Sequence, residues 1–193
     1  QKKSEEADKV LEYMSHTIDD FRNFFMPKKE KENFSLTKAI DSVMIIVSST
    51  LRNYNINLDI QIDPKIKLNT YLNEYEQVLL NIISNAKDIL IEKNVKNPFI
   101  KITAYEEKDY VVMFIEDNGG VITVEPKGKI FEPYFTTKSD SNGTGIGLYM
   151  SKIIVDKNME GKLRVRNTIL GAKFAIFVPK TDNLKKDIKF EIL

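Results

Sequence analysis

The chain has 193 residues, of which 42% are hydrophobic and 30% are charged, and it contains no cysteine, no tryptophan and one histidine, His16. The lack of cysteine excludes disulfides, thiol nucleophiles and cysteine-ligated metal centres, and a single histidine excludes multi-histidine metal sites. Lys and Arg number 29 against 28 Asp and Glu, so the chain lacks the basic excess that favours nucleic acid, and no apolar run approaches the roughly 20 residues that span a bilayer.

The N-terminal residues carry a helical pattern. Residues 4–26 lack Gly and Pro, and apolar side chains such as Val10, Met14, Phe21 and Phe24 recur along one face. This spacing predicts a helix of coiled-coil character, which packs either on its own chain or against a second copy. A charged connector follows Pro27. Because the first residues lack a signal-peptide core and do not begin with Met, we expect a soluble cytoplasmic fragment of a longer protein. The sequence leaves open whether that longer protein is anchored in a membrane.

The rest of the chain alternates between helix and strand patterns. Ser35 is the expected N-cap of a helix, and Asn73 with Glu76 forms a capping-box signature for a longer one. The expected elements in chain order are a helix at 36–51, a strand at 57–62, a helix at about 74–93, strands at 99–105 and 110–116, a loop at 118–142, a helix at 146–157, and strands at 162–167 and 172–178. Hairpins mixed with helices predict an α/β (α+β) two-layer sandwich, with helices on one face of a mixed sheet.

The long loop at 118–142 is the first candidate site. It begins at Asp117-Asn-Gly119-Gly120 and is followed by Gly143-Thr-Gly145-Ile-Gly147, and loops of this length in compact domains are usually functional lids or disordered. Glycines at the start of a helix let backbone N–H groups approach a phosphate, although a plain flexible turn has the same composition. The spacing fits neither the dinucleotide fingerprint nor the P-loop.

Polar residues on the long helix and at the end of one strand are the second candidate. Gln77, Asn81, Asn85 and Asp88 share one helix face, and a carboxamide oxygen suits Mg²⁺, although a polar stripe facing water has the same spacing. Asp117 ends an apolar strand, where its carboxylate would accept a hydrogen bond from an exocyclic amine such as that of adenine. A simple Asp-Asn-Gly turn is the alternative.

Four motifs in order carry a family resemblance. Gln77-Val-Leu-Leu-Asn-Ile-Ile-Ser-Asn-Ala86, Asp117-Asn-Gly-Gly120, Lys129-Ile-Phe-Glu-Pro-Tyr-Phe-Thr-Thr-Lys138 and Gly143-Thr-Gly-Ile-Gly-Leu148 resemble the N, G1, F and G2 boxes of the catalytic ATP-binding domain of sensor histidine kinases. That family has a Bergerat-type fold and is related to the gyrase, Hsp90 and MutL ATPases. The resemblance covers about residues 35–180. In addition, residues 14–25 resemble the end of the second dimerisation helix of such kinases.

The resemblance implies a domain order and a function. Residues 1–27 would be the C-terminal part of the dimerisation region, 28–34 a linker, 35–180 the kinase domain and 181–193 a tail. The domain would transfer the γ-phosphoryl group of ATP to a histidine outside this fragment, for onward transfer to a response regulator, and the full-length protein would form a homodimer through its helix bundle. The alternatives are an ATP-hydrolysing switch and a nucleotide-binding module without kinase activity.

The resemblance also implies a role for each site residue. Asn81 and Asn85 would be catalytic and hold Mg²⁺, Asp117 would bind the adenine amine, and Gly119 would let the base approach. The residues expected around the phosphates are Lys138, Gly143, Thr144, Gly145, Gly147 and Leu148, and Phe131 and Phe135 would anchor the lid.

Three positions depart from the family pattern. Val121 stands where the G1 box usually has its second glycine, so Gly120 would have to supply the positive φ one residue early. Asp88 stands where some relatives place a lysine toward the phosphate. His16 lacks the family's phosphoacceptor context, so we expect an ordinary helix residue there.

Overall fold

The computed structural model describes residues 30–137 and 144–180. The predicted helix at 4–26 with His16, the first two residues of the charged connector, Lys138, Gly143 and the tail at 181–193 therefore lie outside the described residues. Packing within the chain separates residues 1–30 from a second unit, 31–193. Everything described below belongs to this second unit, except Glu30.

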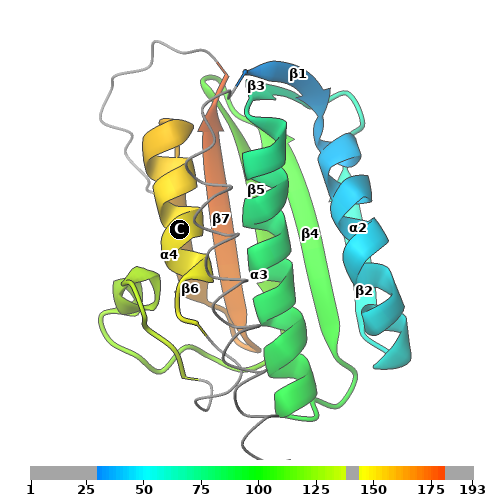
Figure 1. The fold of residues 1–193 in the computed structure, drawn as a ribbon. Coiled ribbons are helices and arrows are strands. Elements are labelled where there is room, and N and C mark those ends of the chain that lie inside the picture. Colours follow the sequence, from blue (N-terminus) through cyan, green and yellow to red (C-terminus); the bar gives the residue numbers. More distant parts are fainter. Residues whose placement is uncertain (1–29, 138–143, 181–193) are drawn as a thin grey trace, which may run out of the picture. The chain divides into compact units, whose positions relative to one another are not determined.

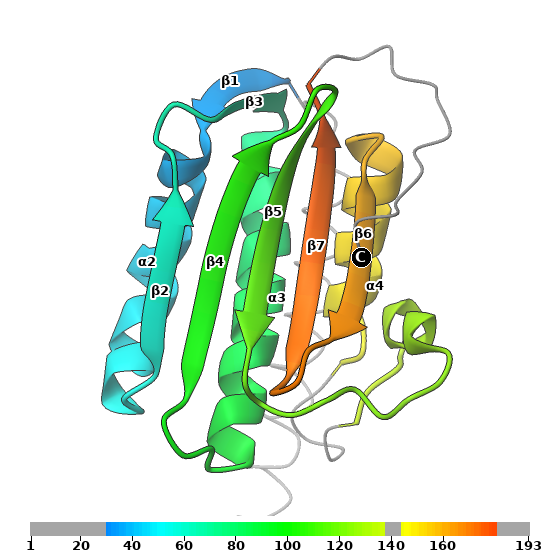
Figure 2. The same ribbon diagram turned by 180° about the vertical axis from the view of Figure 1, so that it is seen from behind.

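A five-stranded mixed sheet forms one layer of the fold (Figure 1). Its strands, in spatial order, are β2 (Asn57–Ile62), β4 (Phe99–Glu106), β5 (Tyr110–Asp117), β7 (Ala172–Pro179) and β6 (Lys162–Asn167). β2 pairs in parallel with β4, and the other neighbours are antiparallel. The helices α2 (Leu36–Asn53), α3 (Leu72–Glu92) and α4 (Gly147–Ile153) cover one face, and the view from behind shows the other face without a described helix (Figure 2). The predicted fold class is confirmed.

The core lies between this sheet and the helices. Alternate residues of β5 face α3, where Tyr75 is fully buried and donates a hydrogen bond from its hydroxyl to Met113 Sδ at 3.5 Å. Ile82 and Ile83 are also fully buried, and each side chain of this size contributes about 1.5–3 kcal/mol on burial. The apolar face of α3 is therefore fixed on the sheet, which leaves Asn81 and Asn85 on its partly buried side.

The start of α3 differs from the prediction. The helix begins at Leu72 with Tyr71 as N-cap, and no side chain caps it, so the predicted capping box of Asn73 and Glu76 is wrong. The reason is a pair of short strands, β1 (Glu32–Ser35) and β3 (Lys67–Thr70), which were not predicted and hold the chain in an extended form up to Thr70. By contrast, Ser35 caps α2 as predicted, since its Oγ accepts a hydrogen bond from the Lys38 amide at 3.2 Å.

The region between β5 and α4 is more ordered than a plain loop. It contains a 3₁₀ helix, η1 (Lys127–Phe131), with Ile130 and Phe131 buried. After it, α4 continues into a π-helical turn, η2 (Ile154–Asn158), and together they cover nearly the predicted span of 146–157. Within residues 30–137 and 144–180, no helix combines the length and apolar character needed to span a membrane.

Candidate functional site

Asn81 links α3 to the start of α4. Its Nδ2 donates to the Gly147 carbonyl at 3.2 Å and to Ser151 Oγ at 3.2 Å, and the Ser151 hydroxyl donates to the same carbonyl at 2.9 Å. Ser151 is fully buried. These bonds place the helix that follows the glycine-rich segment directly beside the polar face of α3, so two of the predicted site residues, Asn81 and Gly147, are in contact.

Asn85 lies one turn further along the same face. Its side chain is partly buried and makes no hydrogen bond or ion pair with any described residue. One more turn along, Ile89 contacts the loop after β5, because a Cβ on Gly119 would come within 2.5 Å of Ile89 Cγ2. A rise of 1.5 Å per residue puts about 12 Å between residues 81 and 89. Asn85 is thus an amide without a described partner, midway between the two glycine-rich segments.

Asp117 is buried at the end of β5. It is 4% exposed, and its Oδ1 accepts a hydrogen bond from the Gly119 amide at 2.7 Å. Burial raises the pKa of this carboxyl to about 6, and the backbone amides of Gly119 and Ala172 and the charge of Lys93 oppose that rise. At neutral pH the carboxylate is therefore mostly ionised, and it is able to accept a hydrogen bond from a ligand amine.

Side chains that the sequence reasoning missed fix the loop after Asp117. Lys93 Nζ donates to the Gly119 carbonyl at 2.7 Å. The Asn118 side chain accepts from the Phe99 amide at 2.8 Å and donates to the Asn97 carbonyl at 3.0 Å. Their only sequence signals were generic, a basic residue at a helix end and an Asx turn residue.

The glycines of this loop have different physical roles. Gly120 has φ +92°, whereas Val121 has no positive φ, so Gly120 supplies the left-handed conformation one residue early. Gly119 has no room for a side chain because of Ile89 and the Asp117 carboxylate. Packing against α3 therefore requires a glycine at position 119, in addition to the predicted need for space for a base.

The described part of the second glycine-rich segment leads into α4. Thr144 Oγ1 accepts a hydrogen bond from the Ile146 amide at 3.2 Å, and Leu148 is partly buried in the first turn. Gly145 has φ +66°, and a Cβ there would collide with the backbone of Tyr134. The chain after η1 therefore touches the glycine-rich segment directly.

Gly145→Ala is expected to weaken nucleotide binding about tenfold, because a left-handed alanine costs about 1–2 kcal/mol and its methyl would displace Tyr134. Titration calorimetry with a non-hydrolysable ATP analogue measures this loss. Gly128→Ala is the matched control, since a Cβ on Gly128 meets nothing within 4 Å. Equal affinities for the two variants would contradict the prediction.

The two predicted anchoring phenylalanines differ in burial. Phe131 is 9% exposed and packs edge-on against Phe174, with ring centroids 6.4 Å apart. Phe135 is partly exposed. Phe131 thus fixes η1 to β7, and the segment that connects η1 to α4 starts from this fixed point.

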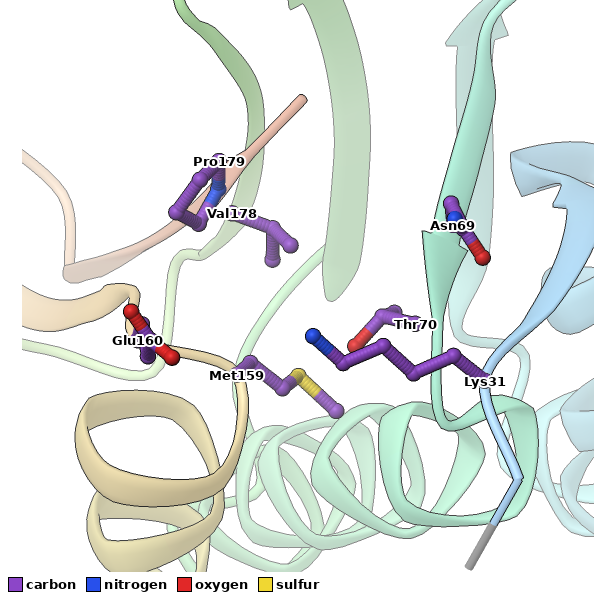
Figure 3. A pocket seen from close by; sticks show the side chains of 7 residues that line it. All are labelled: Lys31, Asn69, Thr70, Met159, Glu160, Val178 and Pro179. Atoms are coloured by element: carbon purple, nitrogen blue, oxygen red, sulfur yellow. The ribbon is translucent and has the colours of Figure 1, made fainter. Parts of the chain in front are cut away.

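A small pocket lies elsewhere, at the opposite end of β7 from Asp117 (Figure 3). It is lined by Lys31, Asn69, Thr70, Met159, Glu160, Val178 and Pro179. None of the predicted site residues takes part in it. Among the described residues, no cluster of three or more His, Cys, Asp or Glu side chains is arranged to hold a metal.

Comparisons with known proteins identify the family of the chain. Residues 72–182 match the family described as histidine kinase-, DNA gyrase B- and HSP90-like ATPase. The chain is 37% identical to the two-component sensor PprA of Pseudomonas aeruginosa over 109 residues, which are 55% of this chain and 12% of PprA. It is 27% identical to the histidine-protein kinase AtoS of Escherichia coli over 175 residues, or 89% of this chain and 28% of AtoS. The chain therefore spans less than a third of either relative.

Solved structures show the same fold. The nucleotide-free catalytic domain of histidine kinase ThkA superposes with a TM-score of 0.70 at 31% identity, and the match covers 79% of this chain and 97% of that domain. A crystal structure of ThkA in complex with the response regulator protein TrrA matches with a TM-score of 0.72 at 26% identity, over 89% of this chain and 48% of the ThkA chain.

Proposed function

This chain belongs to the family of histidine kinase-, DNA gyrase B- and HSP90-like ATPases, and we propose that it is the catalytic, ATP-binding part of a two-component sensor histidine kinase. It would transfer the γ-phosphoryl group of ATP to a histidine outside the described residues. The observation that carries the proposal is the position of Asn85. Its amide, which bonds to no described residue, lies between the Asn81–Gly147 contact and the Ile89–Gly119 contact, where a nucleotide between the two glycine-rich segments would pass.

The arrangement supports a role for each end of the nucleotide. At the Asp117 end, the buried carboxylate suits a base with an exocyclic amine. The tight packing at Gly119 favours a flat group there. At the Gly147 end, the start of α4 and the positive φ of Gly145 suit phosphates. Lys138 and Gly143, which lie outside the described residues, are proposed as phosphate-binding residues on the sequence resemblance alone.

Magnesium fits the donor set. The Asn85 side chain bonds to no residue that the structure describes, and Asn81 uses its Nδ2 on Gly147 and Ser151. Among these residues, the amide oxygens of both asparagines therefore stay available for a cation. Mg²⁺ usually takes few protein ligands together with substrate phosphates. When bound, it would neutralise charge on the transferred phosphoryl group, which is the main chemical requirement of this reaction.

The partners of the whole protein are also proposals. The family resemblance implies a homodimer through the helix bundle, and the ThkA–TrrA complex supports a response regulator receiver domain as the final acceptor. Asn81 occupies the position where an ATP-hydrolysing relative needs a glutamate base. Because an amide does not take up a proton at neutral pH, direct hydrolysis is the less suitable reaction.

Phosphorylation in trans tests the proposal. The chain is mixed with ATP, Mg²⁺ and a separate folded helix pair of the same kinase that carries its phosphoacceptor histidine, and acid-labile phosphate on the helix pair is the expected product. The chain without the helix pair is the control, and His16→Ala shows whether any label on the chain itself comes from His16. Tight ATP binding without labelled helix would contradict kinase activity and favour a nucleotide-binding module.

A further inference from the structure

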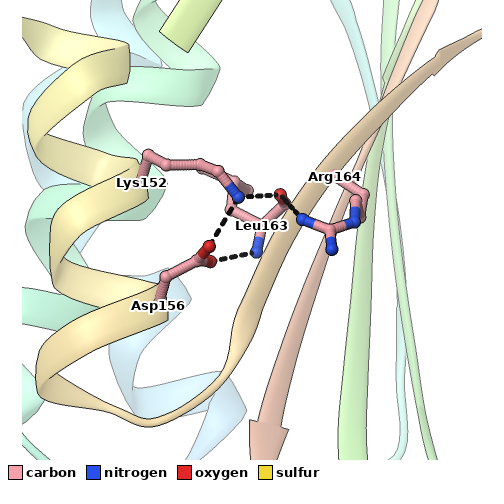
Figure 4. Close-up of polar contacts among 4 residues, drawn as sticks. All are labelled: Lys152, Asp156, Leu163 and Arg164. Carbon is pink, nitrogen blue, oxygen red and sulfur yellow. Dashed lines mark hydrogen bonds and ion pairs between the residues drawn. The ribbon is translucent and has the colours of Figure 1, made fainter. Parts of the chain in front are cut away.

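Lys152 occupies an unusual position on α4, where three parts of the domain meet. Its Nζ donates to Asp156 Oδ2 at 2.6 Å and to the Leu163 carbonyl at 3.0 Å (Figure 4). Asp156 in turn accepts from the Leu163 amide at 2.9 Å. The Lys152 ammonium is thereby held beside β6, with its side chain only 24% exposed.

The same ammonium also lies 5.5 Å from the centroid of the Phe131 ring. Phe131 is the last residue of η1, and its ring also packs edge-on against Phe174 of β7. A cation at this distance from an aromatic face attracts it, and the attraction grows when both groups are shielded from water. Burial lowers the pKa of Lys152 and the Asp156 carboxylate opposes that change, which agrees with a shielded charge.

The neighbouring residue on α4 points to the nucleotide side. Ser151 shares the Gly147 carbonyl with Asn81. Successive residues of one short helix thus contact the predicted phosphate and Mg²⁺ residues on one side and the anchor of η1 on the other. Because the helix is a rigid unit, a shift of Phe131 relative to Lys152 changes where η1 stands relative to Asn81.

We propose that Lys152 is a positioning residue, which holds Phe131 against α4 and so sets the place of η1 beside the nucleotide site. This inference rests on the proposed function. A purely structural role for Lys152 would consist of neutralising Asp156 and bonding to the Leu163 carbonyl. The two roles are separable, because the Asp156 carboxylate and the Phe131 ring are different partners of one ammonium.

A double-mutant cycle tests the inference. Lys152→Met and Phe131→Leu are each expected to weaken binding of a Mg-bound ATP analogue about fivefold, and the double variant should bind no more weakly than either single variant. Lys152→Arg should restore affinity, since a guanidinium reaches the same ring and carboxylate. Urea unfolding, run in parallel, reports stability.

A second pair of variants removes the structural explanation. Lys152→Met alone leaves Asp156 without its cation, whereas Lys152→Met with Asp156→Asn leaves no unpaired charge and should recover stability but not affinity. Recovery of both, or additive losses in the cycle, would overturn the inference alone. A wild-type chain that binds no nucleotide would overturn the proposed function and the inference with it.

Discussion

Asp117→Asn is expected to stabilise the nucleotide-free protein and, at the same time, to remove most of its affinity for ATP. The wild-type carboxyl is 4% exposed and its pKa is raised from 3.8 to about 6. The folded state therefore holds this proton more tightly than the unfolded state does. The free energy of unfolding falls as the pH rises from about 4 to about 6, and it stays lower above that range.

The size of both effects follows from the same buried charge. The raised pKa corresponds to a cost of at most about 3 kcal/mol above pH 6. Asparagine avoids the charge, and its Oδ1 still accepts from the Gly119 amide, but its NH₂ group needs a partner. We expect a net gain of about 1 kcal/mol at pH 8 and none at pH 4. Loss of a charged hydrogen-bond acceptor should weaken ATP binding about 100-fold.

Urea unfolding at pH 4 and pH 8, together with titration of an ATP analogue at pH 8, measures both changes. Glu116→Gln is the matched control, because this neighbouring carboxylate faces the other side of the sheet and pairs with Lys173 at 3.4 Å. It should leave ATP affinity within about twofold. A destabilised Asp117→Asn protein with unchanged affinity would mean that the carboxylate serves the fold and not the nucleotide.

The parts of the fold that the sequence predicted are those with a long periodic pattern. The eighteen residues of α2 and the buried strand β5 each carry enough apolar residues to fix their type and their inward face. The pair β1–β3 has only four residues per strand, and its register joins Glu32 to Thr70. Such a short, distant pairing leaves no local pattern, and the start of α3 was wrongly predicted for the same reason.

The residues of the candidate site also fall into a group that the sequence predicted and a group that it did not. Asn81, Asn85 and Asp117 were predicted because their side chains carry the chemistry and fall in recognisable motifs. Lys93 and Lys152 were missed because their partners are backbone carbonyls 26 and 11 positions away, and a lysine in a helix is usually a solvated charge. The residues that hold a site in place are thus harder to read from sequence than those that contact a ligand.

Asn85→Ala is expected to abolish the magnesium-dependent part of nucleotide affinity without harming the fold. The Asn85 side chain bonds to no described residue, so its removal breaks no hydrogen bond there, and alanine is the better helix former. Stability should therefore rise by a few tenths of a kcal/mol. Loss of one of the two proposed protein ligands of Mg²⁺ should weaken the Mg-ATP complex about 10- to 100-fold.

Titration with an ATP analogue, in Mg²⁺ and again in a chelator, separates the metal-dependent part of the affinity. Wild type should bind more tightly in Mg²⁺, whereas Asn85→Ala should bind equally weakly in both solutions. Asn73→Ala is the matched control, since it makes the same substitution at an exposed position in the first turn of α3. If Asn85→Ala kept the wild-type response to Mg²⁺, the amide would be a solvated helix residue, and the cation would have to be held by Asn81 and the phosphates alone.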